Sequence, residues 1–173
     1  MKPISFFLLL LLCSCEPPEK LEPPEKLERP PALASSPITG GFGWALGKTL
    51  PENCLIENHT YWLFHDPSNA PFINIQVDCL RDRTIYQIQG CADDSSTSVV
   101  ESALQMKYGP GAYSYTTNRH SLSWTNGDGC LTVENYDRKI VTVTYTSSRL
   151  LQKHYDEMDN GISTAASNMA PRL

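Results

Sequence analysis

The sequence has no excess of basic residues and no long hydrophobic run. Lys and Arg number 14 against 19 Asp and Glu, so the formal net charge is −5 and the isoelectric point is near 5.3. A nucleic-acid-binding domain normally presents a basic face, which this composition does not favour. The apolar run at 4–12 would cover about 14 Å as a helix, short of the roughly 30 Å of a bilayer core. The sequence therefore predicts neither a nucleic-acid partner nor a membrane-spanning helix.

Motifs for metal binding, nucleotide binding and catalysis are also missing. The last four cysteines are separated by 25, 12 and 39 positions and include no C-x-x-C pair, so no metal is expected. No G-x-S-x-G nucleophile motif occurs. Residues 41–49 almost match a phosphate-binding loop, but Phe42 replaces its first glycine and Leu50-Pro51 follows where a helix is required. We expect no cofactor, and we expect these glycines to form a turn or a strand edge.

The first fifteen residues have the layout of an export signal. A positive Met1-Lys2 start precedes the apolar run, which ends in Leu12-Cys13-Ser14-Cys15. This ending resembles the lipobox of bacterial lipoproteins. The resemblance implies cleavage before Cys15, a diacylated Cys15 sulfur and an acylated new amino terminus, and it covers only this part of the chain. An ordinary cleaved signal peptide is the alternative.

The same resemblance implies a location. Glu16 follows Cys15, whereas in proteobacterial lipoproteins an Asp at that place tends to retain the protein on the inner membrane. If the source is Gram-negative, the resemblance implies an anchor in the outer membrane, facing the periplasm. Two or more acyl chains hold a protein far more firmly than one.

A proline-rich segment follows the predicted anchor. Residues 16–31 contain Glu-Pro-Pro-Glu-Lys-Leu twice and then Glu-Arg-Pro-Pro, and seven of the thirteen prolines lie between Pro17 and Pro37. Paired prolines interrupt a helix and favour the polyproline II conformation. At about 3.1 Å per residue, residues 16–37 reach up to roughly 70 Å. We predict a tether with a domain boundary near Pro37; a docking strip for a proline-recognising partner is the alternative.

Hydrophobic periodicity predicts an α+β module over residues 38–160, with a flexible tail at 161–173. Helices are expected from the Ser98/Glu101 capping box to Gly109, and from Ser147 or Ser148 to Asn160-Gly161. Strand patterns occur at 42–46, 61–65, 72–78, 84–90, 120–125, 130–135 and 139–146. Together they predict an antiparallel sheet of about five to seven strands with two helices packed on one face.

Four cysteines of this module, Cys54, Cys79, Cys91 and Cys130, would form disulfides in an exported protein. Four cysteines allow three pairings. Alternation along the 72–90 hairpin places Cys79 on the apolar face and Cys91 on the other, which disfavours a bond between them. Cys130 has the same non-apolar parity as Cys91. We therefore expect the pairs Cys91–Cys130 and Cys54–Cys79.

Histidines are the candidates for catalysis. His65, beside Asp66, or His120 could act as a general base in a small hydrolase, with Ser68 or Ser121 as the nucleophile. Surface, rim or packing positions are the preferred interpretation for these histidines, because no nucleophile motif accompanies them. His154 lies in the apolar stripe of the last predicted helix and is expected to pack.

Tyrosines suggest a binding surface. Tyr113, Tyr115 and Asn118 lie in an expected loop rich in Gly and Ser, a composition that suits molecular recognition. The alternative is that both tyrosines fold back onto the sheet. The leading prediction is a lipid-anchored envelope protein without enzymatic activity that binds a protein or cell-wall partner. A small envelope hydrolase and a small-ligand carrier are the alternatives.

Overall fold

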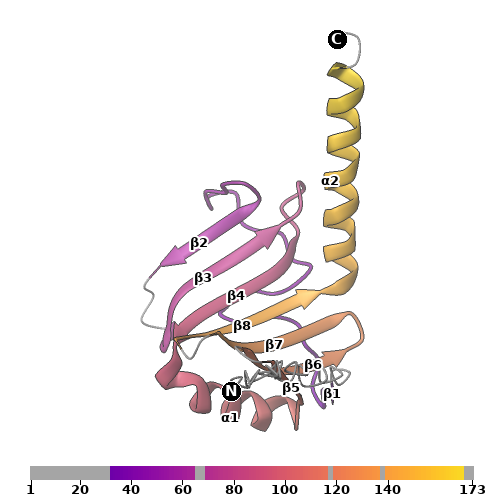
Figure 1. The fold of residues 1–173 in the computed structure, drawn as a ribbon. Helices are drawn as coiled ribbons and strands as arrows, with labels where there is room; N and C mark the ends of the chain where they lie inside the picture. The colour runs from indigo at the N-terminus through magenta and orange to yellow at the C-terminus, as the bar shows by residue number, and fades with distance from the viewer. Residues whose placement is uncertain (1–31, 65–68, 117–118, 137–138, 170–173) are drawn as a thin grey trace, which may run out of the picture.

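The fold is α+β, with one open eight-stranded sheet and two α-helices. A computed structural model describes residues 32–64, 69–116, 119–136 and 139–169 (Figure 1). The strand order is β1-β6-β7-β8-β4-β3-β2, and β5 pairs with β6 on the same side as β1. All pairs are antiparallel except β1 with β6. The strands are β1 (Ala32–Leu33), β2 (Thr60–Phe64), β3 (Phe72–Cys79), β4 (Ile85–Asp93), β5 (Ala112–Thr116), β6 (Arg119–Asn126), β7 (Gly129–Tyr136) and β8 (Ile140–Ser147). The sheet thus has one strand more than the upper end of the predicted range.

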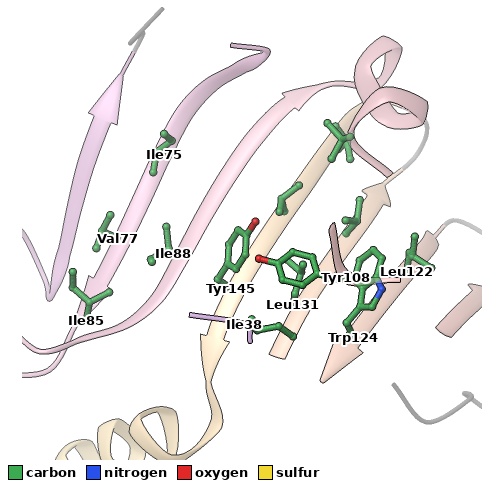
Figure 2. Packing of buried hydrophobic residues seen from close by; sticks show 14 of the residues in the cluster. Ile38, Ile75, Val77, Ile85, Ile88, Tyr108, Leu122, Trp124, Leu131 and Tyr145 are labelled. Atoms are coloured by element: carbon green, nitrogen blue, oxygen red, sulfur yellow. The ribbon is translucent and has the colours of Figure 1, made fainter. Parts of the chain in front are cut away.

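One face of the sheet forms the hydrophobic core (Figure 2). Side chains alternate between the two faces of a strand, so apolar residues at every second position gather on one side. The register aligns such residues in a row across the sheet: Val77, Ile88, Tyr145, Leu131 and Trp124. All five are buried. The alternating patterns of residues 72–90 and 120–146 therefore supply most of the core. Ile73 is the exception: the alternation predicts it beside Ile75 and Val77, but it is 46% exposed, next to a register irregularity between Phe72 and Asn74.

The helix α1 (Thr97–Tyr108) covers one part of this apolar face. Its Val100 and Tyr108 are buried, and Tyr108 contacts Trp124 with 6.3 Å between ring centroids. The helix ends before Gly109 as predicted, but the Ser98/Glu101 capping box is wrong. A short 3₁₀ turn, Asp94–Ser96, precedes the helix, and Thr97 Oγ1 donates to the Asp94 carbonyl at 2.7 Å.

The segment before β2 covers the other part of the apolar face without forming the strand expected at 42–46. Its chain turns repeatedly, because Phe42, Gly43 and Gly47 have φ angles of 56°, 80° and 77°. Extended strands need negative φ, so the predicted strand is wrong there. Phe42 still packs on the sheet, with its ring centroid 4.6 Å from that of Phe72.

The ordered sheet begins before the boundary predicted near Pro37. β1 pairs with Trp124 and Thr125 of β6, and the Ala34 amide donates to the Thr125 carbonyl at 2.8 Å. Ala34 and Ile38 are both buried. The predicted boundary is therefore too late, because residues 32–37 already contribute pairing and packing.

The helix α2 (Ser148–Met169) projects from the end of β8 (Figure 1). Ser147 Oγ accepts a hydrogen bond from the Leu150 amide, which confirms the predicted cap. The predicted end at Asn160-Gly161 is wrong, because the helix runs through Gly161 to Met169. A glycine inside a helix lowers stability by about 1 kcal/mol without necessarily ending the helix. Neither α1 nor the described length of α2 is apolar enough, over enough residues, to cross a bilayer.

Candidate functional site

An aromatic cluster lies where β5 pairs with β6, at an edge of the sheet. Tyr115 of β5 is directly opposite His120 of β6, and Tyr113 is opposite Leu122. The Tyr115 and His120 rings are 4.8 Å apart between centroids and within 4° of parallel. Tyr113 is 6.1 Å from Tyr115 and 5.7 Å from His120, again nearly parallel. The three nearly parallel rings therefore form one compact group, which we call the β5-edge cluster.

The two tyrosines of this cluster remain open to solvent. Tyr115 is 53% exposed and Tyr113 is 36% exposed, whereas Leu122 beside them is fully buried. Residues 109–118 were expected to form a loop, but Ala112–Thr116 form the strand β5. Both tyrosines point to the face that α1 covers, as their pairing with Leu122 and His120 requires. Asn118, the third residue of the predicted binding loop, lies outside the described residues.

The helix α1 adds polar groups to the cluster. Gln105 Nε2 donates to Tyr113 Oη at 2.8 Å, and Glu101 Oε1 lies 3.6 Å from His120 Nε2. Burial raises the pKa of Glu101, and the nearby His120 lowers it in part. Within the described parts of the chain, His120 Nε2 is shielded from solvent and makes no hydrogen bond. The cluster thus combines exposed rings with one carboxyl, one amide and one imidazole.

The structure separates His120 from Ser121, one of its two predicted nucleophiles. Ser121 follows His120 on the same strand, so its side chain points to the opposite face of the sheet and away from the imidazole. A serine nucleophile must instead lie within hydrogen-bonding reach of its base. His65 and Ser68, the other predicted catalytic residues, lie outside the described residues. Parallel tyrosine rings provide rigid contact area, and the neighbouring amide and carboxyl provide hydrogen bonds.

The remaining described histidines pack against other rings. His154 of α2 stacks on Tyr86 with a centroid distance of 4.7 Å and an interplanar angle of 22°. His59 lies 6.0 Å from His154, edge to face. Burial raises the pKa of the Tyr86 hydroxyl, and the nearby Asp78 adds to the effect. These residues join α2 to the β3–β4 hairpin, where Lys153 also pairs with Asp82 at 3.1 Å.

The four cysteines of the module are thiols in this structure. Cys91 pairs with Thr142 of β8, and Cys130 pairs with Thr146 of the same strand. Two strand spacings and four residues of offset place their Cα atoms about 16 Å apart, far beyond the roughly 7 Å that a disulfide allows. They do share the polar face of the sheet, but the predicted Cys91–Cys130 bond is wrong in this register.

The geometry is different for the other pair. Cys79 is buried on the core face, where its Sγ donates to the His59 carbonyl at 3.4 Å. Cys54 contacts Tyr61, which is paired with Val77, two residues before Cys79. Burial raises the pKa of the Cys79 thiol, although Arg83 opposes the effect. Cys54, in the segment before β2, therefore lies on the core side of the β2–β3 pair, as Cys79 does, and their disulfide remains a prediction.

The other candidate motifs have structural roles in the fold. Thr49 bridges to Thr84 of the β3–β4 turn, so a helix does not follow residues 41–49 as a phosphate-binding loop would need. Asp94 lies in the turn before α1 and accepts hydrogen bonds from Asn135 and Thr97. Over the described ranges, no three His, Cys, Asp or Glu side chains come together as a metal site.

No protein-family model, no curated protein and no solved structure matches the chain. Sequence reasoning identified Tyr113, Tyr115 and His120 but missed the part played by Glu101 and Gln105. Their spacing of four residues places both on one side of a helix, which was the available signal. Which strand that side would face could not be read from the spacing.

Proposed function

We propose that this chain is a lipid-anchored protein of the bacterial cell envelope that binds a partner through the β5-edge cluster. The observation that carries the proposal is the pair of exposed, nearly parallel rings of Tyr113 and Tyr115 beside His120. Tyrosines pay little conformational entropy when they bind, because only two side-chain torsions are fixed. Glu101 and Gln105 supply the polar contacts that orient a partner.

The amino-terminal segment supports the location. The resemblance of Leu12-Cys13-Ser14-Cys15 to a lipobox supports acylation of Cys15, and Glu16 supports the outer membrane, facing the periplasm, in a Gram-negative source. The proline-rich segment would hold the folded part away from the lipid. Tethering raises the local concentration of the module at the membrane, which strengthens capture of a partner there.

Export also supports a disulfide between Cys54 and Cys79. It would close a loop of about 25 residues, which the chain-entropy model values at roughly 3 to 4 kcal/mol. It would fasten the irregular segment before β2 to the sheet. Protein isolated from the envelope should then have two of its four module cysteines protected from alkylation, and four reactive thiols would contradict the bond.

The anchor is tested by acyl labelling and membrane fractionation. Cys15→Ala should abolish incorporation of a labelled fatty acid and release the protein from membranes. Cys13→Ala is the matched control and should remain labelled and membrane-bound. Labelling that persists in Cys15→Ala but disappears in Cys13→Ala would show that Cys13, and not Cys15, carries the acyl groups.

The binding surface is tested by capture from solubilised envelopes. The full chain should retain its partner, and Tyr115→Ser should lose it, because the outermost exposed ring is removed without disturbing the core. Lys48→Ala changes an exposed side chain of the segment before β2 and should retain the partner. Equal capture by all three proteins would contradict a role for the β5-edge cluster.

A further inference from the structure

The helix α2 contacts the sheet with only one of its sides. That side is a row of half-buried residues spaced by four, three and four positions: Leu150, His154, Glu157 and Gly161. His154 stacks on Tyr86, and a Glu157 carboxylate oxygen accepts a hydrogen bond from the Arg81 amide at 3.4 Å. The helix then continues past the β3–β4 hairpin to Met169, beyond the end of the sheet (Figure 1).

A second stripe of α2 is apolar and lies about a quarter turn around the helix from this side. Its members are separated by alternating steps of four and three residues: Leu151, Tyr155, Met158, Ile162, Ala165 and Met169. Such steps keep the six positions on one side of a helix. Of the seven apolar residues from 151 to 169, only Ala166 lies outside this set. We call the set the α2 seam.

The centre of the α2 seam is open to solvent. Tyr155 is 53% exposed and Met158 is 50% exposed, although both side chains are large and apolar. An amphipathic helix of a globular protein normally turns its apolar stripe towards its own core. Here the side that meets the sheet contains His154 and Glu157, and the apolar stripe lies beside it. The packing of this chain therefore does not account for the α2 seam.

The charge of α2 distinguishes between a lipid surface and another helix as the occupant. Helices that lie on membranes carry Lys and Arg on their polar face. After Lys153, α2 contains no Lys or Arg up to Met169, whereas Asp156, Glu157 and Asp159 are acidic. Anionic lipid would repel such a face, so the charge favours a helix. The other helix of this chain, α1, packs on the sheet well away from α2 (Figure 1).

We propose that the α2 seams of two copies of this chain pair as a parallel two-stranded coiled coil. An apolar heptad repeat is the pattern that packs against a helix with the same repeat. The 22 residues of α2 are about 33 Å long, which is enough for three heptads. In heptad letters, the d positions are Leu151, Met158 and Ala165, and the a positions are Tyr155, Ile162 and Met169.

A second copy in parallel also complements the residues that flank the α2 seam. In a parallel pair, a residue at g lies beside the residue at e five positions later on the other helix. His154 is at g and Asp159 is at e, so each imidazole lies beside a carboxylate of the second copy. In an antiparallel pair, e positions face e positions, and the other e residues of α2 are Gln152 and Ala166. Only the parallel pair therefore gives Asp159 an imidazole neighbour.

Photo-crosslinking of the full chain in intact cells tests the pairing. A benzophenone amino acid replaces Tyr155, and two copies with different epitope tags are expressed together. We expect a product of twice the chain mass that carries both tags. The control has the benzophenone at position 163, about 120° around the helix from the α2 seam, and should not give this product. The proposal goes beyond the partner binding proposed above and does not depend on it, since α2 contains no residue of the β5-edge cluster.

Substitutions of Met158, added to the chain with benzophenone at 155, test the parallel alignment. Position 158 meets its own counterpart in a parallel pair, so Met158→Asp in both copies, or Met158→Lys in both, places like charges together. Each should reduce the product at least about tenfold, because the charges lie in a desolvated seam. One copy with Met158→Asp and one with Met158→Lys should regain it. Ser163→Asp adds the same charge away from the α2 seam and should leave the product unchanged.

Several results would overturn the proposal. One is the absence of the double-mass product from position 155, and another is an equal yield from position 163. A product only with a different protein or with lipid would assign the α2 seam to that occupant instead. Unchanged crosslinking in both homotypic Met158 variants would exclude the α2 seam as the contact. Failure of the mixed Met158→Asp and Met158→Lys pair to regain the product would exclude the parallel alignment.

Discussion

Gly90→Ala should destabilise the module because of the way the segment before β2 packs on the sheet. Gly90 lies on the core side of β4, opposite Ile75 and Val143. A Cβ at this position would lie 2.5 Å from Phe42 Cζ and 2.9 Å from Phe72 Cδ1. Such contacts are too short for carbon atoms, so the two rings would have to move. Overpacking of this kind costs about 1–3 kcal/mol, while replacing a strand glycine regains about 0.5–1 kcal/mol. From the central values of both ranges, we expect the free energy of unfolding to fall by about 1 kcal/mol.

Urea unfolding of the full chain in detergent measures this change. Phe42→Leu shortens the ring that meets the new methyl group, so the Gly90→Ala/Phe42→Leu double variant should lose less stability than the two single changes predict together. Coupling between touching residues is typically about 0.5–3 kcal/mol. Two results would show that Phe42 does not cover β4. One is a free energy of unfolding that Gly90→Ala leaves unchanged, and the other is a double variant whose loss of stability equals the sum of the two single losses.

Three further predictions concern other parts of the fold. Gly161→Ala should raise the free energy of unfolding by about 0.5–1 kcal/mol, since α2 continues through this position; a loss of helical circular dichroism would contradict that. Trp124→Phe should lower it by about 1–3 kcal/mol in urea unfolding, because the Gly109 carbonyl loses the indole donor at 2.8 Å. The hydrogen bonds from Thr84 lower the pKa of Asp82 to about 2, with smaller effects from other neighbours. The ionised Asp82 carboxylate should therefore stabilise the folded state above pH 4, and this stabilisation should disappear as the pH falls towards 2. Asp82→Asn should remove the corresponding part of the pH dependence of stability. An NMR titration that gives Asp82 a pKa near 4 would refute this prediction.

Much of the sheet could be predicted because local patterns specify it. Residues 120–135 alternate strictly around Asn126-Gly127-Asp128-Gly129, and the structure pairs Asn126 with Gly129 as the turn requires. The segment 42–46 has equally apolar residues but follows a turning path, because Phe42 and its neighbouring glycines adopt positive φ. Because glycine adopts positive and negative φ about equally well, its presence in the sequence does not show which path the backbone takes.

The candidate site was only partly predictable for a different reason. Tyr113 and Tyr115 lie among Gly, Ser and Asn residues, which indicate a loop, yet pairing with β6 makes this segment a strand. The pairing is a tertiary effect that overrides local preference. The sequence predicts a helix-capping role for Glu101, whereas in the structure it faces His120 across the α1–sheet interface. No local pattern specifies that contact.

Site-specific photo-crosslinking in intact cells tests the proposed binding role most directly. A benzophenone amino acid replaces Tyr115 in the acylated full chain, and a second protein carries it at the exposed Lys48 as the control. We expect a discrete crosslinked product from position 115 that disappears when Glu101→Ala and Gln105→Ala are added, and no such product from position 48. The absence of a product from position 115, or the same product from both positions, would contradict partner binding at the β5-edge cluster.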